Sequence, residues 1–307
     1  MSPDLIAVIV RALGFVALFQ AAGVALFLAG FGHQLSTAHQ GIRHLGLIAA
    51  AAGIVLVLAH LSLDPARMAG DFSGVWDTDL QRLAWNSPSG TSQMAQVIGL
   101  LVVLTSLSLS AEQAAGLQAI AVIGAVIALG AFLLTGHTRA HPLRALLAPL
   151  LALHLFVIAF WFGALLPLIH ITRTESAAVT ARVLRRFSSV AGALVPLLAV
   201  AGIAMAAILC GSFSALHQRY GQLLLVKLAG LLILLMLAAY NRWRLVPALP
   251  ADAETTSVSA TANTAAADRA AALGAAAALR RSMGAEYLLI VAVLGVTDVL
   301  TSFFSPH

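Results

Sequence analysis

Charged residues are scarce in this 307-residue chain, which is 9% charged and 61% hydrophobic, with a mean hydropathy of +0.97. A soluble domain usually carries about a quarter charged residues. The composition therefore excludes a fold whose whole surface faces water. It predicts instead a single integral membrane domain over residues 1–307, with the lipid bilayer as its main surroundings.

Cysteine is almost absent as well, since Cys210 is the only one. One cysteine cannot form an internal disulfide, and it excludes a Cys-rich metal cage. The chain also has no GxGxxG or Walker pattern and no nucleophile elbow. A nucleotide-driven pump therefore has no support in the sequence, and we expect no enzyme activity.

What the sequence has in abundance is long apolar stretches, each able to cross about 30 Å of hydrocarbon at about 1.5 Å per residue. They cover residues 5–31, 44–62, 93–110, 116–135, 143–169, 189–211, 221–241 and 285–304. Strand-like alternation is absent, and backbone groups in lipid must be paired internally. We therefore predict an all-α polytopic membrane helix bundle with about eight transmembrane helices.

The arginines indicate the orientation of this bundle rather than a face that binds nucleic acid. An even number of spans places both termini on one side. The connections opposite the termini hold ten arginines: Arg43, Arg173, Arg182, Arg185, Arg186, Arg242, Arg244, Arg269, Arg280 and Arg281. Those on the terminus side hold five: Arg67, Arg82, Arg139, Arg144 and Arg219. Because cytoplasmic loops carry the excess of Arg and Lys, both termini are predicted to be periplasmic, in a bacterial inner membrane.

Two connections are long. Residues 63–92 contain Trp76, Trp85 and an acidic run, and we predict a periplasmic loop with a short helix at the membrane interface. Residues 248–279 are rich in Ala, Thr and Ser, and we predict a flexible cytoplasmic loop.

Ten histidines are the main chemical signal, because neutral imidazole is a common ligand for copper, zinc and haem iron. His137 and His141 are four residues apart, just before Pro142. In a helix they would share a face and a metal ion, whereas in a turn they would belong to a polar hairpin. His60 falls at the same predicted membrane face. These three histidines form a candidate metal site at the periplasmic mouth.

His154 lies deeper, about 18 Å along its predicted helix from Pro142. Ionisable groups at that depth are costly and usually face the bundle interior or a water-filled path. An interhelical hydrogen bond is the structural alternative. Trp161 follows at i+7, on a similar face. We predict that His154 faces the interior and binds a metal ion.

Three formal charges also lie inside predicted spans, namely Arg11, Lys227 and Asp298. All three share about the same depth, in the outer half of the membrane. Lys227 and Asp298 are on consecutive antiparallel helices, and we predict that they form an ion pair. Alternatively, these charges line a polar cavity beside His154.

In the second half of the chain, several apolar segments each carry a few polar residues. The segments are His154-Leu-Phe-Val-Ile-Ala-Phe-Trp161-Phe-Gly163-Ala-Leu-Leu-Pro167, Arg186-Phe187-Ser188, Tyr220-Gly221 to Lys227, Asn241-Arg242-Trp243-Arg244, Leu279-Arg280-Arg281-Ser282 with Glu286, and Leu300-Thr301-Ser302. Together they resemble the CopD family of bacterial copper-resistance membrane proteins, from about residue 130 onward. The chain departs from the family at Ala201-Gly202, where a Thr-Gly pair is expected, and at Asp298, usually an apolar position.

The resemblance implies an eight-span bundle that handles copper, commonly beside a small periplasmic copper-binding protein of the CopC type. We therefore predict copper transport for copper resistance or homeostasis. His60, His137 and His141 would receive the ion at the periplasmic mouth and pass it to His154.

Two other functions remain open. A b-type cytochrome would hold haem b between His154 and either His60 or His137. An assembly partner of a periplasmic copper chaperone would have a purely structural role. The sequence indicates no particular oligomeric state.

Overall fold

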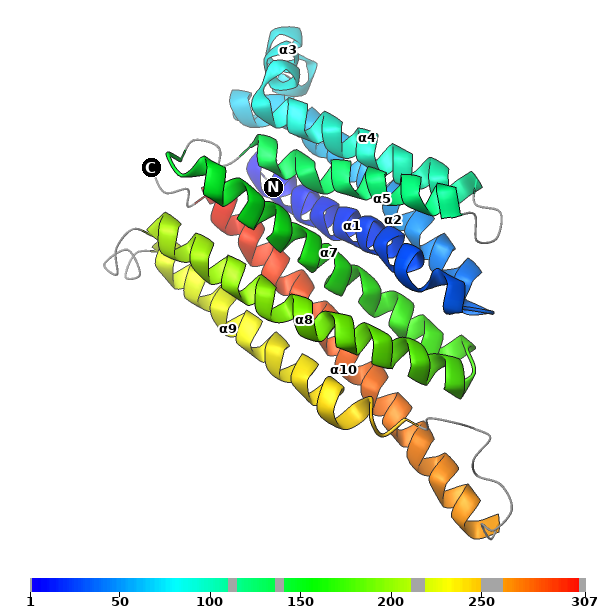
Figure 1. Cartoon of the computed structure of the whole chain (residues 1–307). Coiled ribbons are helices and arrows are strands. Elements are labelled where there is room, and N and C mark those ends of the chain that lie inside the picture. Colours follow the sequence, from blue (N-terminus) through cyan, green and yellow to red (C-terminus); the bar gives the residue numbers. More distant parts are fainter. Residues whose placement is uncertain (1, 110–114, 136–140, 211–218, 250–261, 304–307) are drawn as a thin grey trace.

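The computed structural model describes residues 2–109, 115–135, 141–210, 219–249 and 262–303. Within these ranges every regular element is a helix, and no strand occurs. Eight helices there are long and apolar enough to cross a membrane (Figure 1). The predicted all-α bundle with about eight spans is therefore confirmed.

The eight spanning helices each cover all or most of one predicted stretch. They are α1 (Pro3–Phe31), α2 (Ala38–Ala69), α4 (Pro88–Leu109), α5 (Ala115–Gly130), α7 (Arg144–Thr174), α8 (Ala177–Cys210), α9 (Arg219–Tyr240) and α10 (Ala262–Phe303). Several run past the predicted ends; α2, with 32 residues, exceeds the 44–62 stretch at both ends. Hydropathy marks only the apolar part of a helix, whereas backbone hydrogen bonding continues into its polar ends.

Local chemistry explains where the helices begin and end. α1 begins at Pro3, whose missing N–H is not needed in the first turn, and Ser2 Oγ accepts a hydrogen bond from the backbone N–H of Leu5. α2 ends before Gly70, which adopts the left-handed conformation with a φ of 82°.

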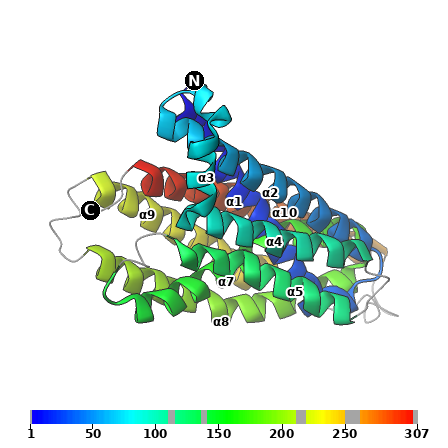
Figure 2. The ribbon, with the colours of Figure 1, turned by 90° about the horizontal axis from the view of Figure 1, so that it is seen from above.

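The connection predicted over 63–92 contains the last turns of α2, a 3₁₀ turn (Phe72–Trp76), α3 (Thr78–Asn86) and the first turns of α4. The short helix predicted there is therefore α3, whose N-terminus is capped by Asp77. Trp76 is 84% exposed. α3 stands at the edge of the bundle and packs against α2 and α4 (Figures 1 and 2).

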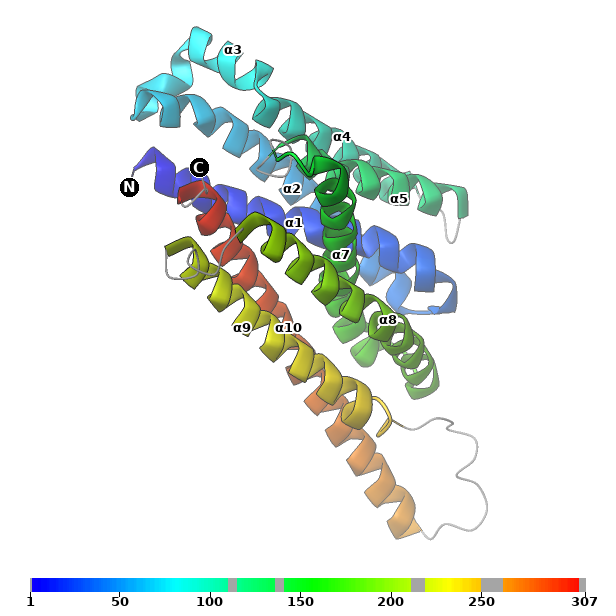
Figure 3. The same cartoon turned by 60° about the vertical axis from the view of Figure 1, so that its left-hand side comes forward.

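The flexible loop predicted over 248–279 is largely helical where it is described. Residues 250–261 lie outside the described part of the chain, and from Ala262 onward the chain belongs to α10. The physical reason is the alanine content of this segment, because Ala has the highest helix propensity. The first turns of α10 extend past the other helices (Figures 1 and 3).

The centre of the bundle is α1, which packs against α2, α4, α5, α7 and α10. Its closest approach is to α7, where Gly23 meets Gly163. A Cβ atom added to Gly23 would lie 2.1 Å from the carbonyl oxygen of Ala159 and 2.4 Å from the Cα of Gly163. Gln20 reinforces this crossing, since its Nε2 donates to the carbonyl of Gly163 at 3.0 Å. Small residues thus allow two helix backbones to touch.

The remaining helices, α8, α9 and α10, form a more open part of the bundle (Figure 3). α8 packs against α7, and α9 packs against α10. Only 17% of the most apolar stretch of α8 and of α9 is buried, against 50% for α1. A cavity of about 410 Å³ lies between α7, α8, the end of α9 and α10.

The first turns of α1 and the last turns of α10 lie at the same end of the bundle (Figure 1). We call this end the terminus side and the other end the opposite side. The periplasmic location of the terminus side stays a prediction.

Candidate functional site

Three groups of polar side chains in the described part of this apolar bundle bear on the predicted sites. A network of charged and polar groups around His60 lies toward the terminus side. His154 lies about 15 Å along α7 from Arg144. A third group, around Glu286, lines the large cavity toward the opposite side.

The network on the terminus side begins with an ion pair between α1 and α10. The Arg11 guanidinium donates to Asp298 through Nε, and its Nη2 donates to the Asp298 carbonyl and to Thr301 Oγ1, both at 3.0 Å. Asp298 is fully buried, with 0% exposure. The pair therefore satisfies a charge that would be costly if isolated among apolar helices.

The predicted ion pair between Lys227 and Asp298 is wrong. Asp298 pairs with Arg11, and no ion pair of Lys227 occurs among the described residues. Equal depth was inferred correctly for Arg11 and Asp298. The helix that faces α10 at that depth is α1, although it lies at the other end of the sequence.

His60 is buried in α2 and bonded to Gln93 of α4, with 3.2 Å between His60 Nδ1 and Gln93 Oε1. The orientation of the Gln93 amide follows from its other bonds, because Nε2 donates to Asp64 Oδ2 and to Ser89 Oγ, both at 3.1 Å. Gln93 Oε1 can only accept, so Nδ1 carries the proton of the neutral imidazole. The lone pair of His60 is therefore on Nε2.

Nε2 of His60 has no hydrogen-bond partner among the described residues. His60 also lines a cavity of about 100 Å³, together with Arg11, Gln93 and Gln96. A metal ligand with its other ring nitrogen fixed by a second group is the usual arrangement for histidine in metal sites. The geometry at His60 thus suits coordination of a small cation.

The charges around His60 are paired. Arg67 bonds Asp4 at 3.1 Å and Asp64 at 3.5 Å, and Arg11, which lines the cavity, bonds Asp298. A cation would therefore bind in this cavity through the lone pair of His60, beside a guanidinium that is already paired.

His154 lies between α7 and its neighbours rather than on a lipid-facing surface. A Cβ atom on Gly202 of α8 would lie 3.3 Å from His154 Cε1, so the ring lies over this glycine. The buried Nδ1 has no hydrogen-bond partner. His154 therefore faces α8, and its role as a metal ligand stays a prediction.

Lys227 of α9 is the charge that the structure brings close to His154. It acts electrostatically on the imidazole. No ion pair of Lys227 occurs in the described part of the chain. An ammonium beside His154 opposes cation binding there, so any copper site at His154 is weak.

Of the predicted pair His137 and His141, only His141 lies within the described residues. It occupies a turn before α7, where its Nδ1 accepts a hydrogen bond from the backbone N–H of Leu143 at 3.1 Å. No group of three or more His, Cys, Asp or Glu side chains that could hold a metal ion occurs among the described residues. The shared metal ion of His60, His137 and His141 therefore stays a prediction.

The residues proposed as haem ligands do not fit haem well at His60. The cavity there holds about 100 Å³. Pockets for organic ligands usually hold about 300–1,000 Å³. The cavity beside His60 is thus the size of an ion with a few waters rather than that of a porphyrin.

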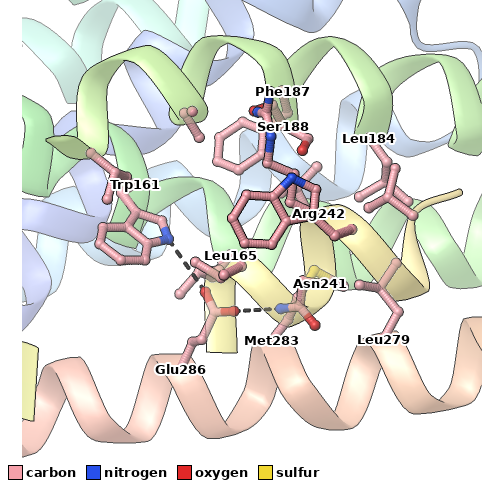
Figure 4. A pocket seen from close by; sticks show the side chains of 18 of the residues that line it. Trp161, Leu165, Leu184, Phe187, Ser188, Asn241, Arg242, Leu279, Met283 and Glu286 are labelled. Atoms are coloured by element: carbon pink, nitrogen blue, oxygen red, sulfur yellow. Dashed lines mark hydrogen bonds between the residues drawn. The ribbon is translucent and has the colours of Figure 1, made fainter. Parts of the chain in front are cut away.

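Glu286 is a buried polar residue that was not among the predicted site residues. It is 2% exposed, on α10, and it accepts hydrogen bonds from Trp161 Nε1 at 3.3 Å and from Asn241 Nδ2 (Figure 4). Asn241 stands at the start of a π-helical turn (Asn241–Leu245) that extends α9. Such turns widen the helix and often occur at functional sites. All three side chains line the 410 Å³ cavity.

A sequence signal for Glu286 existed, because Met283 and Glu286 are three residues apart and share a helix face. Glu286 falls just inside the span predicted over 285–304, and the sequence indicates it only as part of the resemblance to the CopD family. In the structure it lies about 26 Å from the end of α10, deep within the helix. The sequence indicates Trp161 as a candidate residue, but it does not indicate Glu286 as the hydrogen-bond partner of Trp161.

On the opposite side, Glu175 connects the end of α7 to the start of α2. Its carboxylate accepts hydrogen bonds from the backbone N–H groups of Ser36, Thr37 and Ala38, each at 2.8 Å, and from Ser36 Oγ. Partial burial raises the pKa of Glu175, but these hydrogen bonds outweigh it, so the pKa lies below its ordinary value. This is a structural cap, not a metal site.

Comparisons with known proteins cover most of the chain. Residues 1–142 match the family model described as the N-terminal domain of copper resistance protein D-like proteins, and residues 181–300 match the model of copper resistance protein D. No curated protein and no solved structure matches the chain.

Proposed function

The chain belongs to the copper resistance protein D family, and we propose that it transports copper ions across the bacterial inner membrane, starting at His60. As a member of this family it is a multi-pass membrane protein of copper resistance or homeostasis.

The observation that supports this function best is the state of the His60 ring. Gln93 and Asp64 fix its tautomer so that Nε2 offers a lone pair beside an ion-sized cavity. Neutral imidazole binds both oxidation states of copper. No bond of the cargo is made or broken, so the protein acts without enzyme activity.

His154 is the next ligand along the path. From the terminus side it lies slightly deeper than Arg11, at about 15 Å against about 12 Å along the respective helices. Lys227 keeps copper binding at His154 weak, and a conduit needs such weak sites because each ion must leave again. His137 and His141, at the mouth, would deliver the ion to His60.

The terminus side is periplasmic in this proposal, because the arginine excess lies in the connections on the opposite side. A soluble periplasmic copper-binding protein of the CopC type would then be the donor or acceptor of the ion at that face.

The test compares His60→Gln and His154→Gln with His44→Gln, a control at an exposed histidine toward the opposite side. Cells expressing each variant are assayed for copper accumulation and copper tolerance, and purified protein for copper content. We expect His60→Gln and His154→Gln to abolish the copper-dependent differences and His44→Gln to leave them unchanged. Gln keeps a hydrogen bond but is a poor copper ligand.

A second variant addresses the ring tautomer. Gln93→Leu leaves His60 in place but removes the acceptor for Nδ1, and loss of such a partner weakens metal binding by about 10- to 100-fold. Unchanged copper binding in His60→Gln would remove His60 from the path. Absence of any copper binding and copper phenotype in the unmodified protein would refute the proposed function.

A further inference from the structure

The Glu286 pocket contains oxygen acceptors without an opposing positive charge. Glu286 receives hydrogen bonds only from two neutral donors, the Trp161 indole and the Asn241 amide. Asn241 is 8% exposed, and its Oδ1, in the same pocket, is buried without a hydrogen-bond partner. Buried acceptors that lack donors are costly and call for a bound partner.

Arg242 lines the same pocket but does not neutralise Glu286. Its guanidinium donates to the carbonyl of Ser188 and lies against Gly192, where an added Cβ atom would overlap it. Both contacts are on α8, across the pocket from α10. Figure 4 shows the Glu286 carboxylate directed at Trp161 and Asn241. The Asn241 amide meets Glu286 through Nδ2, and no cation in the described part of the pocket is bonded to the Glu286 carboxylate.

A third ligand in this pocket is a thioether. Met283, which is 3% exposed, lies one turn before Glu286 on the same face of α10 and lines the cavity. Thioether sulfur is a soft ligand that selects Cu(I) over harder cations.

We propose that Glu286, Met283 and Asn241, with its amide turned so that Oδ1 faces the carboxylate, bind Cu(I) in this pocket, as a second copper site on the path. This inference rests on the proposed function, which supplies copper as the cargo. A single carboxylate and a monovalent ion form a neutral pair, which costs less in an apolar bundle than a pair with residual charge. The Trp161 indole holds the carboxylate in position, as an outer partner does in metal sites.

The site has a route to the outside of the bundle. Trp243, which is 72% exposed, belongs to the cavity lining together with Arg242. The cavity therefore reaches the protein surface near the end of α9. An ion bound at Glu286 would be positioned for release toward the opposite side.

The test uses the full-length protein in lipid nanodiscs, titrated anaerobically with Cu(I) held by a chromogenic chelator. Met283→Leu and Glu286→Gln are compared with Met236→Leu, a control at a 57% exposed methionine of α9. We expect Met283→Leu and Glu286→Gln each to weaken one Cu(I) site at least ten-fold, and Met236→Leu to leave it unchanged. X-ray absorption at the copper edge should show a sulfur ligand that Met283→Leu removes.

The outcomes separate this proposal from the proposed function. If the unmodified protein binds copper but all three variants bind it equally, the pocket site is refuted and the function through His60 stands. A weakened site in Glu286→Gln with no sulfur ligand and a normal Met283→Leu also refutes the Cu(I) site. If the unmodified protein binds no copper at all, the proposed function itself fails.

Discussion

The two parts of the bundle differ in how closely their helices approach. Around α1, glycines bring backbones into contact at Gly23 and Gly163, and again at Gly99 and Gly124 between α4 and α5. Around α8, α9 and α10, side chains stand off from one another and leave the 410 Å³ cavity. The first part is a rigid support, whereas the second has space for a ligand and for rearrangement.

Buried polar groups occur in both parts. In the compact part, Asp64, Arg67 and Gln93 are bonded to one another, whereas Gln20 Oε1, at the crossing of α1 and α7, lacks a hydrogen-bond partner. In the open part, Asn241 Oδ1 lacks one as well. The two parts therefore differ in the space between their helices rather than in the pairing of their polar groups.

The largest expected effect concerns the ion pair that joins the two parts. Asp298→Ala removes the carboxylate opposite the largely buried Arg11 guanidinium, and breaking a buried pair in this way costs about 3–5 kcal/mol. Arg11→Met combined with Asp298→Leu should recover most of that loss. Unfolding of the purified variants in detergent measures both. Equal stability of the single and the double variant would contradict the pairing as described.

A smaller effect tests the compact part directly. Gly23→Ala places a Cβ atom against the backbone of α7, which cannot move aside as a side chain can, and we expect a loss of about 3 kcal/mol. Gly295→Ala in α10 is the matched control, because nothing lies within 4 Å of its added Cβ. It should be neutral or stabilise the protein by about 0.5–1 kcal/mol, since Ala favours helix over Gly. Similar unfolding temperatures for the two variants would contradict the proposed difference in helix packing between the two parts.

Glu175→Gln should cost about 1 kcal/mol, as loss of a helix cap does. The pKa of Glu175 is lowered in the folded state, so its ionised form stabilises the protein fully above about pH 4.5, the ordinary value. That contribution is lost as the pH falls below this value through the lowered pKa. We therefore expect the free energy of unfolding of the unmodified protein to exceed that of Glu175→Gln at pH 7, and this difference should narrow as the pH is lowered to 3. A constant gap would mean that the carboxylate charge is irrelevant to the cap.

The smallest stability effect is expected in the open part. Ala239→Leu adds three carbons to the lining of the Glu286 cavity, and filling such a space is neutral or stabilising by about 0.5 kcal/mol. Copper accumulation should fall nevertheless, because the space is needed for the ion. Stability loss comparable to that of Gly23→Ala would show that the cavity is closed in the native protein.

The fold was predictable because hydropathy is a local property. Each span is visible in its own 20 residues, and the caps at Ser2 and Gly70 are local too. The segment from Ala262 was predicted as a loop because small residues occur both in linkers and in helices. Its helical state follows from the propensity of consecutive alanines.

The site was only partly predictable. The sequence indicates how deep a residue lies along its helix, but it does not indicate which neighbouring helix faces that residue. Depth placed Arg11 and Asp298 together and His154 inside the bundle. It could not identify the facing helix, so Lys227 was assigned to the wrong partner. Neither Gln93 as the residue that fixes His60, nor Asn241 as the partner of Glu286, has any sequence signal, since both contacts join distant segments.

The ion pair between Arg11 and Asp298 sets the order of assembly during synthesis. The two residues are 287 positions apart, which at about 5–20 residues per second separates their appearance by roughly 15–60 s. Throughout that interval the first span carries a guanidinium whose carboxylate has not yet been made. The nascent α1 must keep Arg11 near water, lipid headgroups or an insertion factor, and it reaches its final depth only when α10, the last helix, enters the membrane.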